Sequence, residues 1–134
     1  MNNIQAHRGP DGKGVWIHDR IIAGLAHRRL SIIDLTPTAS QPMFSESGSV
    51  ITYNGEIYNY IELRQELGEE NFKTTSDTEV ILRAYEKWGE ECVERLRGMF
   101  AFAIWDEKES RLFCARDRFG IKPFYFTKNK EGFF

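Results

Sequence analysis

Residues 50–59 read Val50-Ile51-Thr52-Tyr53-Asn54-Gly55-Glu56-Ile57-Tyr58-Asn59, a short apolar run that leads directly into an Asn-Gly pair. The β-branched and aromatic side chains of residues 50–53 predict a strand. Taken alone, Asn54-Gly55 after a strand favours a tight turn, because this dipeptide readily adopts positive φ angles. From Ile57 onward the apolar residues return at near-helical spacing. The pattern therefore predicts a change from strand to helix within this stretch.

Helices are predicted after this strand. The first spans residues 57–67 and ends before a glycine. The second spans residues 76–88 and carries its apolar residues on one face. Ser76 and Glu79 stand three positions apart at its start, which is the spacing of a capping box. A further short helical turn is predicted at residues 92–96, stopped by a glycine.

Strands are predicted on both sides of these helices. The apolar runs that predict them are residues 15–17, 21–26, 30–33, 99–105, 111–115 and 122–127. The runs 99–105 and 111–115 flank a polar turn and form a predicted β-hairpin. Residues 36–49 contain two prolines and many small polar side chains, so a loop is expected there. This order predicts an α+β fold with antiparallel sheet covered by helices.

Composition limits the classes of protein to be considered. A chain of 134 residues with 41% hydrophobic and 28% charged residues is expected to form one globular domain, residues 1–134. A net charge of -2 gives no case for a nucleic-acid partner or an anionic membrane surface. No apolar run approaches a membrane span and no signal peptide is recognised, so a cytoplasmic location is expected. Cys92 and Cys114 are then expected as free thiols, and no metal site is predicted.

Four motifs follow one another along the chain. They are His7-Arg8-Gly9-Pro10-Asp11, Arg28-Arg29-Leu30-Ser31-Ile32, Asn54-Gly55-Glu56-Ile57-Tyr58-Asn59 and Ser76-Asp77. This series resembles the glutaminase domain of asparagine synthetase, a class II glutamine amidotransferase of the N-terminal-nucleophile family. The resemblance covers nearly the whole chain. It implies an αββα sandwich, with two antiparallel sheets between helices, that is incomplete at both ends here.

The resemblance also implies a binding site for L-glutamine. Arg29 would hold the α-carboxylate, since an arginine fork donates two parallel charge-assisted hydrogen bonds. Asn54 and Gly55 would form the oxyanion hole, Asp77 would receive the α-ammonium group, and Glu56 would line the same pocket. Taken without the resemblance, Arg29 is more simply a solvated charge. Asp77 is likewise explained as a residue that stabilises the dipole of its helix.

The nucleophile of the family has no counterpart in the sequence. In the family a cysteine at the mature N-terminus attacks the glutamine amide and uses its own α-amino group as the base. This chain opens Met1-Asn2-Asn3, and neither Cys92 nor Cys114 has a free amine. The chain as written is therefore expected to bind glutamine at most. The segment of residues 7–11 is assigned a structural role around its Gly-Pro turn.

The parts of the family that the chain lacks set further expectations. A first strand carries the cysteine, and a synthetase domain that uses ATP and magnesium follows the glutaminase domain, so no cofactor is expected in this chain. Without the first strand, sheet edges are left unpaired, which predicts lower stability and a possible homodimer. Expected partners are L-glutamine and a synthetase domain or subunit. Two alternatives stay open, namely a non-catalytic glutamine-binding or subunit-interaction module, and a glutaminase that serves a sugar or peptide acceptor.

Overall fold

The computed structural model describes residues 3–20 and 22–134. In chain order the elements are η1 (Ala6–Arg8), β1 (Gly12–Ile17), β2 (Gly24–Arg29), η2 (Pro37–Ala39), β3 (Met43–Phe44), β4 (Val50–Ile57), α1 (Tyr60–Leu67), η3 (Glu69–Asn71), α2 (Asp77–Trp88), η4 (Gly89–Glu91), α3 (Cys92–Arg95), β5 (Gly98–Asp106), β6 (Arg111–Arg116), β7 (Lys128–Asn129) and β8 (Gly132–Phe133). The α+β class predicted from the sequence is confirmed.

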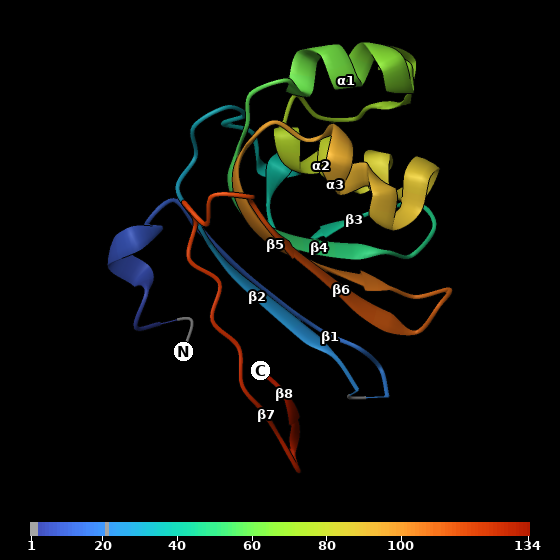
Figure 1. The fold of residues 1–134 in the computed structure, drawn as a ribbon. Coiled ribbons are helices and arrows are strands. Elements are labelled where there is room, and N and C mark those ends of the chain that lie inside the picture. Colours follow the sequence, from blue (N-terminus) through green and yellow to red (C-terminus); the bar gives the residue numbers. More distant parts are fainter. Residues whose placement is uncertain (1–2, 21) are drawn as a thin grey trace.

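The centre of the fold is an antiparallel sheet in the order β3-β4-β5-β6. Figure 1 shows α1, α2 and α3 over one face of this sheet and the hairpin β1–β2 beneath the other. The described residues therefore form a layer of helices, a central sheet and a layer made by the β1–β2 hairpin. A short hairpin, β7–β8, follows near the C-terminus.

The two faces of β5 explain why the sheet lies between two layers. Phe100, Phe102 and Ile104 are buried against the helices, where they pack with apolar residues of α2. Trp105 is buried on the opposite side with Leu25 of the β1–β2 hairpin. Because successive side chains of a strand point to opposite faces, an apolar run such as β5 is expected where both faces are covered.

Helix α2 begins directly after Ser76, as the capping-box prediction requires, but the reciprocal hydrogen bonds of the box do not form. The Ser76 side chain caps the helix by accepting a hydrogen bond from the Thr78 N–H, with an N–O distance of 3.1 Å. Glu79 does not bond back to Ser76 as the capping-box prediction requires, and that detail was wrong. Its carboxylate instead accepts from the backbone N–H groups of Lys73 and Thr74. Ser76 is therefore the N-cap, and Glu79 holds the loop before it.

Two predicted strands are absent from the described residues. Residues 30–33 form bends and loop, with Leu30 and Ile32 exposed, because the chain turns there toward the start of α2. Residues 122–127 are also irregular. The backbone of Lys122 is engaged by side chains, since Asp117 accepts from its N–H while Arg116 donates to its carbonyl. Thr127 at the other end pairs with the backbone of Phe134.

The other predicted elements agree with the structure within a few residues. The strand predicted at 15–17 lies in β1, and the strand predicted at 21–26 is displaced to β2, with Ile21 outside the described residues. The helices predicted at 57–67, 76–88 and 92–96 correspond to α1, α2 and α3, and the hairpin predicted at 99–115 corresponds to β5–β6. The loop predicted at 36–49 also contains η2 and the two-residue strand β3.

Candidate functional site

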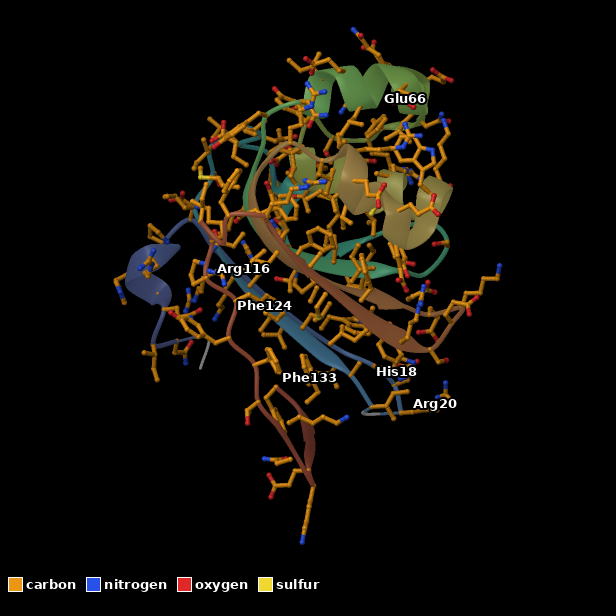
Figure 2. The ribbon with its side chains drawn as sticks, in the orientation of Figure 1. His18, Arg20, Glu66, Arg116, Phe124 and Phe133 are labelled. Carbon is orange, nitrogen blue, oxygen red and sulfur yellow. The ribbon has the colours of Figure 1, made fainter. Side chains whose placement is uncertain are left out.

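The five residues predicted to bind glutamine line one cavity of about 830 Å³. They come from three elements, since Arg29 lies at the end of β2, Asn54, Gly55 and Glu56 lie in β4, and Asp77 is the first residue of α2. The segment after β6 completes the wall with Lys122, Pro123, Phe124 and Tyr125. Figure 2 labels Phe124 on this segment. Residues that are far apart in the sequence thus surround one space.

Asp77 supplies a buried anion. Its side chain is 5% exposed, and its Oδ2 atom accepts hydrogen bonds from the Tyr53 hydroxyl at 2.7 Å and the Ile57 N–H at 3.1 Å. Burial raises the pKa of Asp77 above its usual range, although these two hydrogen bonds oppose the rise. The N-terminus of α2 also favours a negative charge at this position. Asp77 is therefore placed and oriented both by its helix and by β4.

Arg29 supplies a cation whose orientation is set by backbone carbonyls. Its Nη1 atom donates to the Thr36 carbonyl at 2.8 Å, and Nη2 donates to the Asp34 carbonyl. A guanidinium has five N–H donors, so these two bonds leave others on the group for a ligand. Arg29 is half-buried at the cavity. This environment differs from that of a fully solvated surface arginine.

Asn54 and Gly55 continue β4 and do not form a turn. Asn54 pairs with Ala101 of β5, and Gly55 pairs with Phe100. A Cβ atom added to Gly55 would lie 2.2 Å from the Met99 carbonyl oxygen, so only glycine permits this approach of the two strands. The tight turn that the dipeptide favours in isolation was therefore the wrong interpretation. The strand places the exposed Asn54 side chain and the half-buried Glu56 at the cavity.

His27 and Tyr53 are cavity residues that the sequence patterns did not reveal. His27 Nδ1 lies 3.3 Å from the Thr52 hydroxyl, and burial together with the positive charge of Arg29 lowers the pKa of His27 to about 4. The Tyr53 hydroxyl donates to Asp77, and burial beside that carboxylate raises the pKa of Tyr53. Both are alternating residues of strands, and no local motif distinguishes them from ordinary packed side chains.

Two loop residues before β4 were also missed. Gln41 accepts from the Tyr53 N–H at 2.7 Å and donates to the Thr78 hydroxyl at 3.2 Å, so it joins β4 to α2. Asp34 is buried and accepts from residues of two segments. The Asp-x-Thr spacing of Asp34 and Thr36 is a local signal for a side-chain turn that could have been noticed.

The segment 7–11 packs against the end of β2, as its predicted structural role requires. The Asp11 carboxylate accepts from the Ser31 N–H at 2.9 Å, and a Cβ atom on Gly9 would lie 2.5 Å from the Arg28 carbonyl carbon. His7 forms its hydrogen bond with the Ile4 carbonyl. The segment is therefore held by contacts to the end of β2 and to Ile4.

The two cysteines lie away from the cavity wall. Cys92 is the first residue of α3 and is fully buried in the core, and burial raises the pKa of its thiol to about 12. Cys114 is half-buried on β6, and burial also raises the pKa of its thiol. The described residues contain no group of three histidine, cysteine, aspartate or glutamate side chains placed to hold a metal ion. Within residues 3–20 and 22–134, no helix has the length and apolar character to cross a membrane.

Known proteins are similar to this chain in sequence. Asparagine synthetase [glutamine-hydrolyzing] 1 of Bacillus subtilis is 51% identical over 95% of the chain, which spans 20% of that protein. Asparagine synthetase [glutamine-hydrolyzing] 3 of the same organism is 45% identical over 99% of the chain, which spans 22% of that protein. Amidase chry2 of Gibberella zeae is 45% identical over 96% of the chain, which spans 20% of it. The chain thus corresponds to about a fifth of each of these relatives.

A solved structure shares the fold. The glutamine phosphoribosylpyrophosphate amidotransferase of Bacillus subtilis, complexed with ADP and GMP, superimposes with a TM-score of 0.68 at 23% identity, over 82% of this chain and 26% of that chain. This similarity supports the predicted N-terminal-nucleophile fold. Residues 1–134 also match the family described as "Glutamine amidotransferase domain". The chain therefore belongs to the glutamine amidotransferase domain family, among the asparagine-synthetase-like proteins.

Proposed function

We propose that the chain binds L-glutamine in the cavity between β2, β4 and α2. The observation that carries the proposal is the presence of Arg29 and Asp77 in one cavity with Asn54 and Gly55. L-Glutamine presents a carboxylate, an ammonium group and a neutral amide. A fixed cation, a buried anion and an amide donor on an exposed strand residue complement these three groups.

The same arrangement provides the electrostatic part of glutamine hydrolysis. Attack on the side-chain amide places negative charge on its oxygen, and donors at Asn54 and Gly55 would stabilise that charge. Hydrolysis also needs a nucleophile with a base. Neither Cys92 nor Cys114 lines the cavity, and the elevated pKa of Cys92 disfavours its thiolate. By itself, the 134-residue chain is therefore proposed to bind glutamine without releasing ammonia.

In the whole protein we place this domain as the ammonia-supplying part of an asparagine synthetase. The names of the Bacillus subtilis relatives, which are glutamine-hydrolysing asparagine synthetases, support this assignment. Ammonia would pass to a synthetase domain or subunit that uses ATP to activate aspartate. A second candidate is a glutaminase that serves a sugar or peptide acceptor, since one relative of 45% identity is named as an amidase and not as an asparagine synthetase. The acceptor is decided outside the cavity described here.

The test is a titration of the chain with L-glutamine in which binding is measured by calorimetry and by the chemical-shift changes of backbone amides in NMR spectra. We expect saturable binding with a 1:1 ratio and shifts centred on Arg29, Asn54 and Asp77. Asn54→Ala should weaken glutamine binding by about two- to ten-fold, because one neutral hydrogen bond contributes about 0.5–1.5 kcal/mol. The same variant should bind L-norvaline, which lacks the amide, with unchanged affinity.

The control is Asn71→Ala, since Asn71 is an exposed asparagine outside this cavity. It should bind L-glutamine as the unmodified chain does. Absence of saturable binding, or shifts confined to residues away from the cavity, would overturn the proposal. An enzyme-coupled ammonia assay on the same sample should give no release above background. Clear release would contradict the proposal that the 134-residue chain binds glutamine without hydrolysing it.

A further inference from the structure

Asp34 connects two segments of the chain through its two carboxylate oxygens. Its Oδ1 atom accepts from the Thr36 N–H at 2.8 Å and from the Thr36 hydroxyl at 2.6 Å. Its Oδ2 atom accepts from the Thr75 N–H at 2.9 Å and from the Thr75 hydroxyl at 3.0 Å. The side chain is 7% exposed. One buried carboxylate thus ties the loop after β2 to the segment that precedes α2.

The first of these segments orients the cation of the site. The carbonyl groups that accept from the Arg29 guanidinium belong to Asp34 and Thr36. These are the residues whose conformation the Asp34 carboxylate fixes by closing a local turn. The position of the guanidinium therefore depends on Asp34 through two backbone carbonyls.

The second segment holds the anion of the site. Thr75 is followed by Ser76, the N-cap of α2, and by Asp77 at the first helical position. The preceding residue, Thr74, is held by Glu79, and its hydroxyl accepts from the Ser76 N–H at 3.2 Å. A displacement of Thr75 would therefore move the helix start that carries Asp77.

We propose that Asp34 is a positioning residue that sets the distance and orientation between Arg29 and Asp77. The inference rests on the proposed function, because it assigns the recognition of the α-carboxylate and α-ammonium groups to those two residues. Asp34 does not itself receive the ammonium group. Its oxygens already accept four hydrogen bonds, which is about the number that a carboxylate can accept.

The ionisation of Asp34 agrees with this role. Burial by itself raises the pKa of the carboxyl group, but the hydrogen bonds from Thr36 and Thr75 outweigh it and bring the pKa to about 2. The four hydrogen bonds to the Asp34 carboxylate, here called the clamp, are therefore present throughout the pH range in which L-glutamine is a zwitterion. A charged acceptor also makes each of these hydrogen bonds stronger than a neutral one would be.

The proposal predicts how binding of different ligands changes when the clamp is weakened. L-Glutamine must contact Arg29 and Asp77 together, whereas glutaramate, which lacks the ammonium group, needs only Arg29. In Asp34→Asn, one carboxylate oxygen is replaced by an NH2 group that cannot accept a hydrogen bond. We expect L-glutamine to bind about ten-fold more weakly, glutaramate to change by less than about three-fold, and the preference for L- over D-glutamine to fall.

Milder variants keep the test valid if Asp34→Asn does not fold. Thr75→Val removes one hydroxyl donor and should show the same pattern with a smaller loss. Thr75→Ser keeps the donor and should restore binding of L-glutamine. Asp106→Asn is the matched control, because Asp106 also accepts from a hydroxyl and a backbone N–H but lies outside the cavity.

The outcomes separate the inference from the function on which it rests. If the unmodified chain does not bind L-glutamine, the proposed function fails. If the unmodified chain binds L-glutamine, and Asp34→Asn and Thr75→Val bind each ligand as tightly as the unmodified chain does, the positioning role is overturned. Equal losses for L-glutamine and glutaramate would also overturn it, because Asp34 would then act on the fold or on Arg29 alone and not on the spacing between Arg29 and Asp77. A selective loss for L-glutamine with reduced L-over-D preference supports it.

Discussion

His27 illustrates how a single residue in this cavity acquires properties that its identity does not predict. It lies on β2, two residues before Arg29, and its pKa is lowered to about 4 by burial and by that neighbouring charge. An ordinary histidine has a pKa of about 6.5. His27 is therefore neutral at pH 7 and adds no positive charge to the cavity.

This shift predicts a pH effect with a defined sign. Between about pH 6.5 and 4 the unfolded chain binds a proton at His27 and the folded chain does not, so the contribution to stability falls as pH falls. An NMR titration of the His27 ring should give a midpoint of about 4. The free energy of unfolding of His27→Gln, measured with urea, should fall less across that pH window than that of the unmodified chain. A midpoint near 6.5 would contradict the buried position.

Arg29→Gln serves as the control for the cause of this shift. Removing the neighbouring charge should raise the His27 midpoint, while burial should still keep it below the value of an ordinary histidine. If the midpoint did not move at all, the guanidinium would not contribute to the field at His27. The comparison therefore separates the electrostatic cause from the effect of burial.

At the scale of elements, β4 shows how one strand contributes both to the hydrophobic core and to the site. Ile51 and Tyr53 pack toward the helices, while residues 54–56 reach the cavity. Gly55 is central, because its pairing with Phe100 brings the two backbones close together. The strand therefore depends on glycine for pairing and on Asn54 for its proposed chemistry.

Gly55→Ala is expected to destabilise the fold by about 1–3 kcal/mol, the usual cost of overpacking a well-packed region. The added Cβ would lie 2.2 Å from the Met99 oxygen and 2.8 Å from the Phe100 Cα, both of which are backbone atoms. Gly24→Ala is the matched control, because its Cβ would lie 3.5 Å from the nearest atom. Urea unfolding measures both, and equal stabilities would rule out the steric account.

At the scale of the whole molecule, the β1–β2 hairpin is joined to the central sheet at its far end. Figure 2 shows His18 and Arg20 labelled there. His18 Nε2 lies 3.2 Å from the Glu107 carboxylate, and its Nδ1 accepts from the Arg20 N–H at 3.1 Å. Trp105 Nε1 donates to the same carboxylate at 2.8 Å. Aromatic rings and one carboxylate thus connect two layers of the fold.

Loss of this contact should release the hairpin more than the sheet. In His18→Ala, we expect faster amide hydrogen exchange in β1 and β2, with little change in β5 and β6, because the central sheet keeps its own core. Lys108→Ala, which alters an exposed residue of the neighbouring turn, is the control. Equal acceleration in all strands would show that His18 contributes to global stability and does not act as a local connection.

Much of this architecture was predictable from local patterns, and particular residues show where the patterns failed. Helix α2 has an apolar face, an N-cap and a terminal glycine, and its prediction from these signals is confirmed. Residues 122–127 have an apolar pattern typical of a strand, but side chains of Arg116 and Asp117 engage the backbone of Lys122, where that strand would begin. Competition between side chains and a neighbouring strand for the same backbone groups depends on residues that meet only after folding, so the periodicity of the sequence does not reveal it.

The candidate site also has features that the sequence predicts and features that only the folded structure reveals. Arg29, Asn54, Gly55, Glu56 and Asp77 were predicted from motifs that resemble those of the glutaminase family, whereas each residue taken alone has a simpler structural explanation. Their presence in one cavity, the neutral state of His27 and the bridge made by Asp34 depend on the packing of β2, β4 and α2. Local sequence specifies which groups are available and where strands and helices form. Only the tertiary structure sets distances between segments and removes water around them, and both determine how those groups bind and ionise.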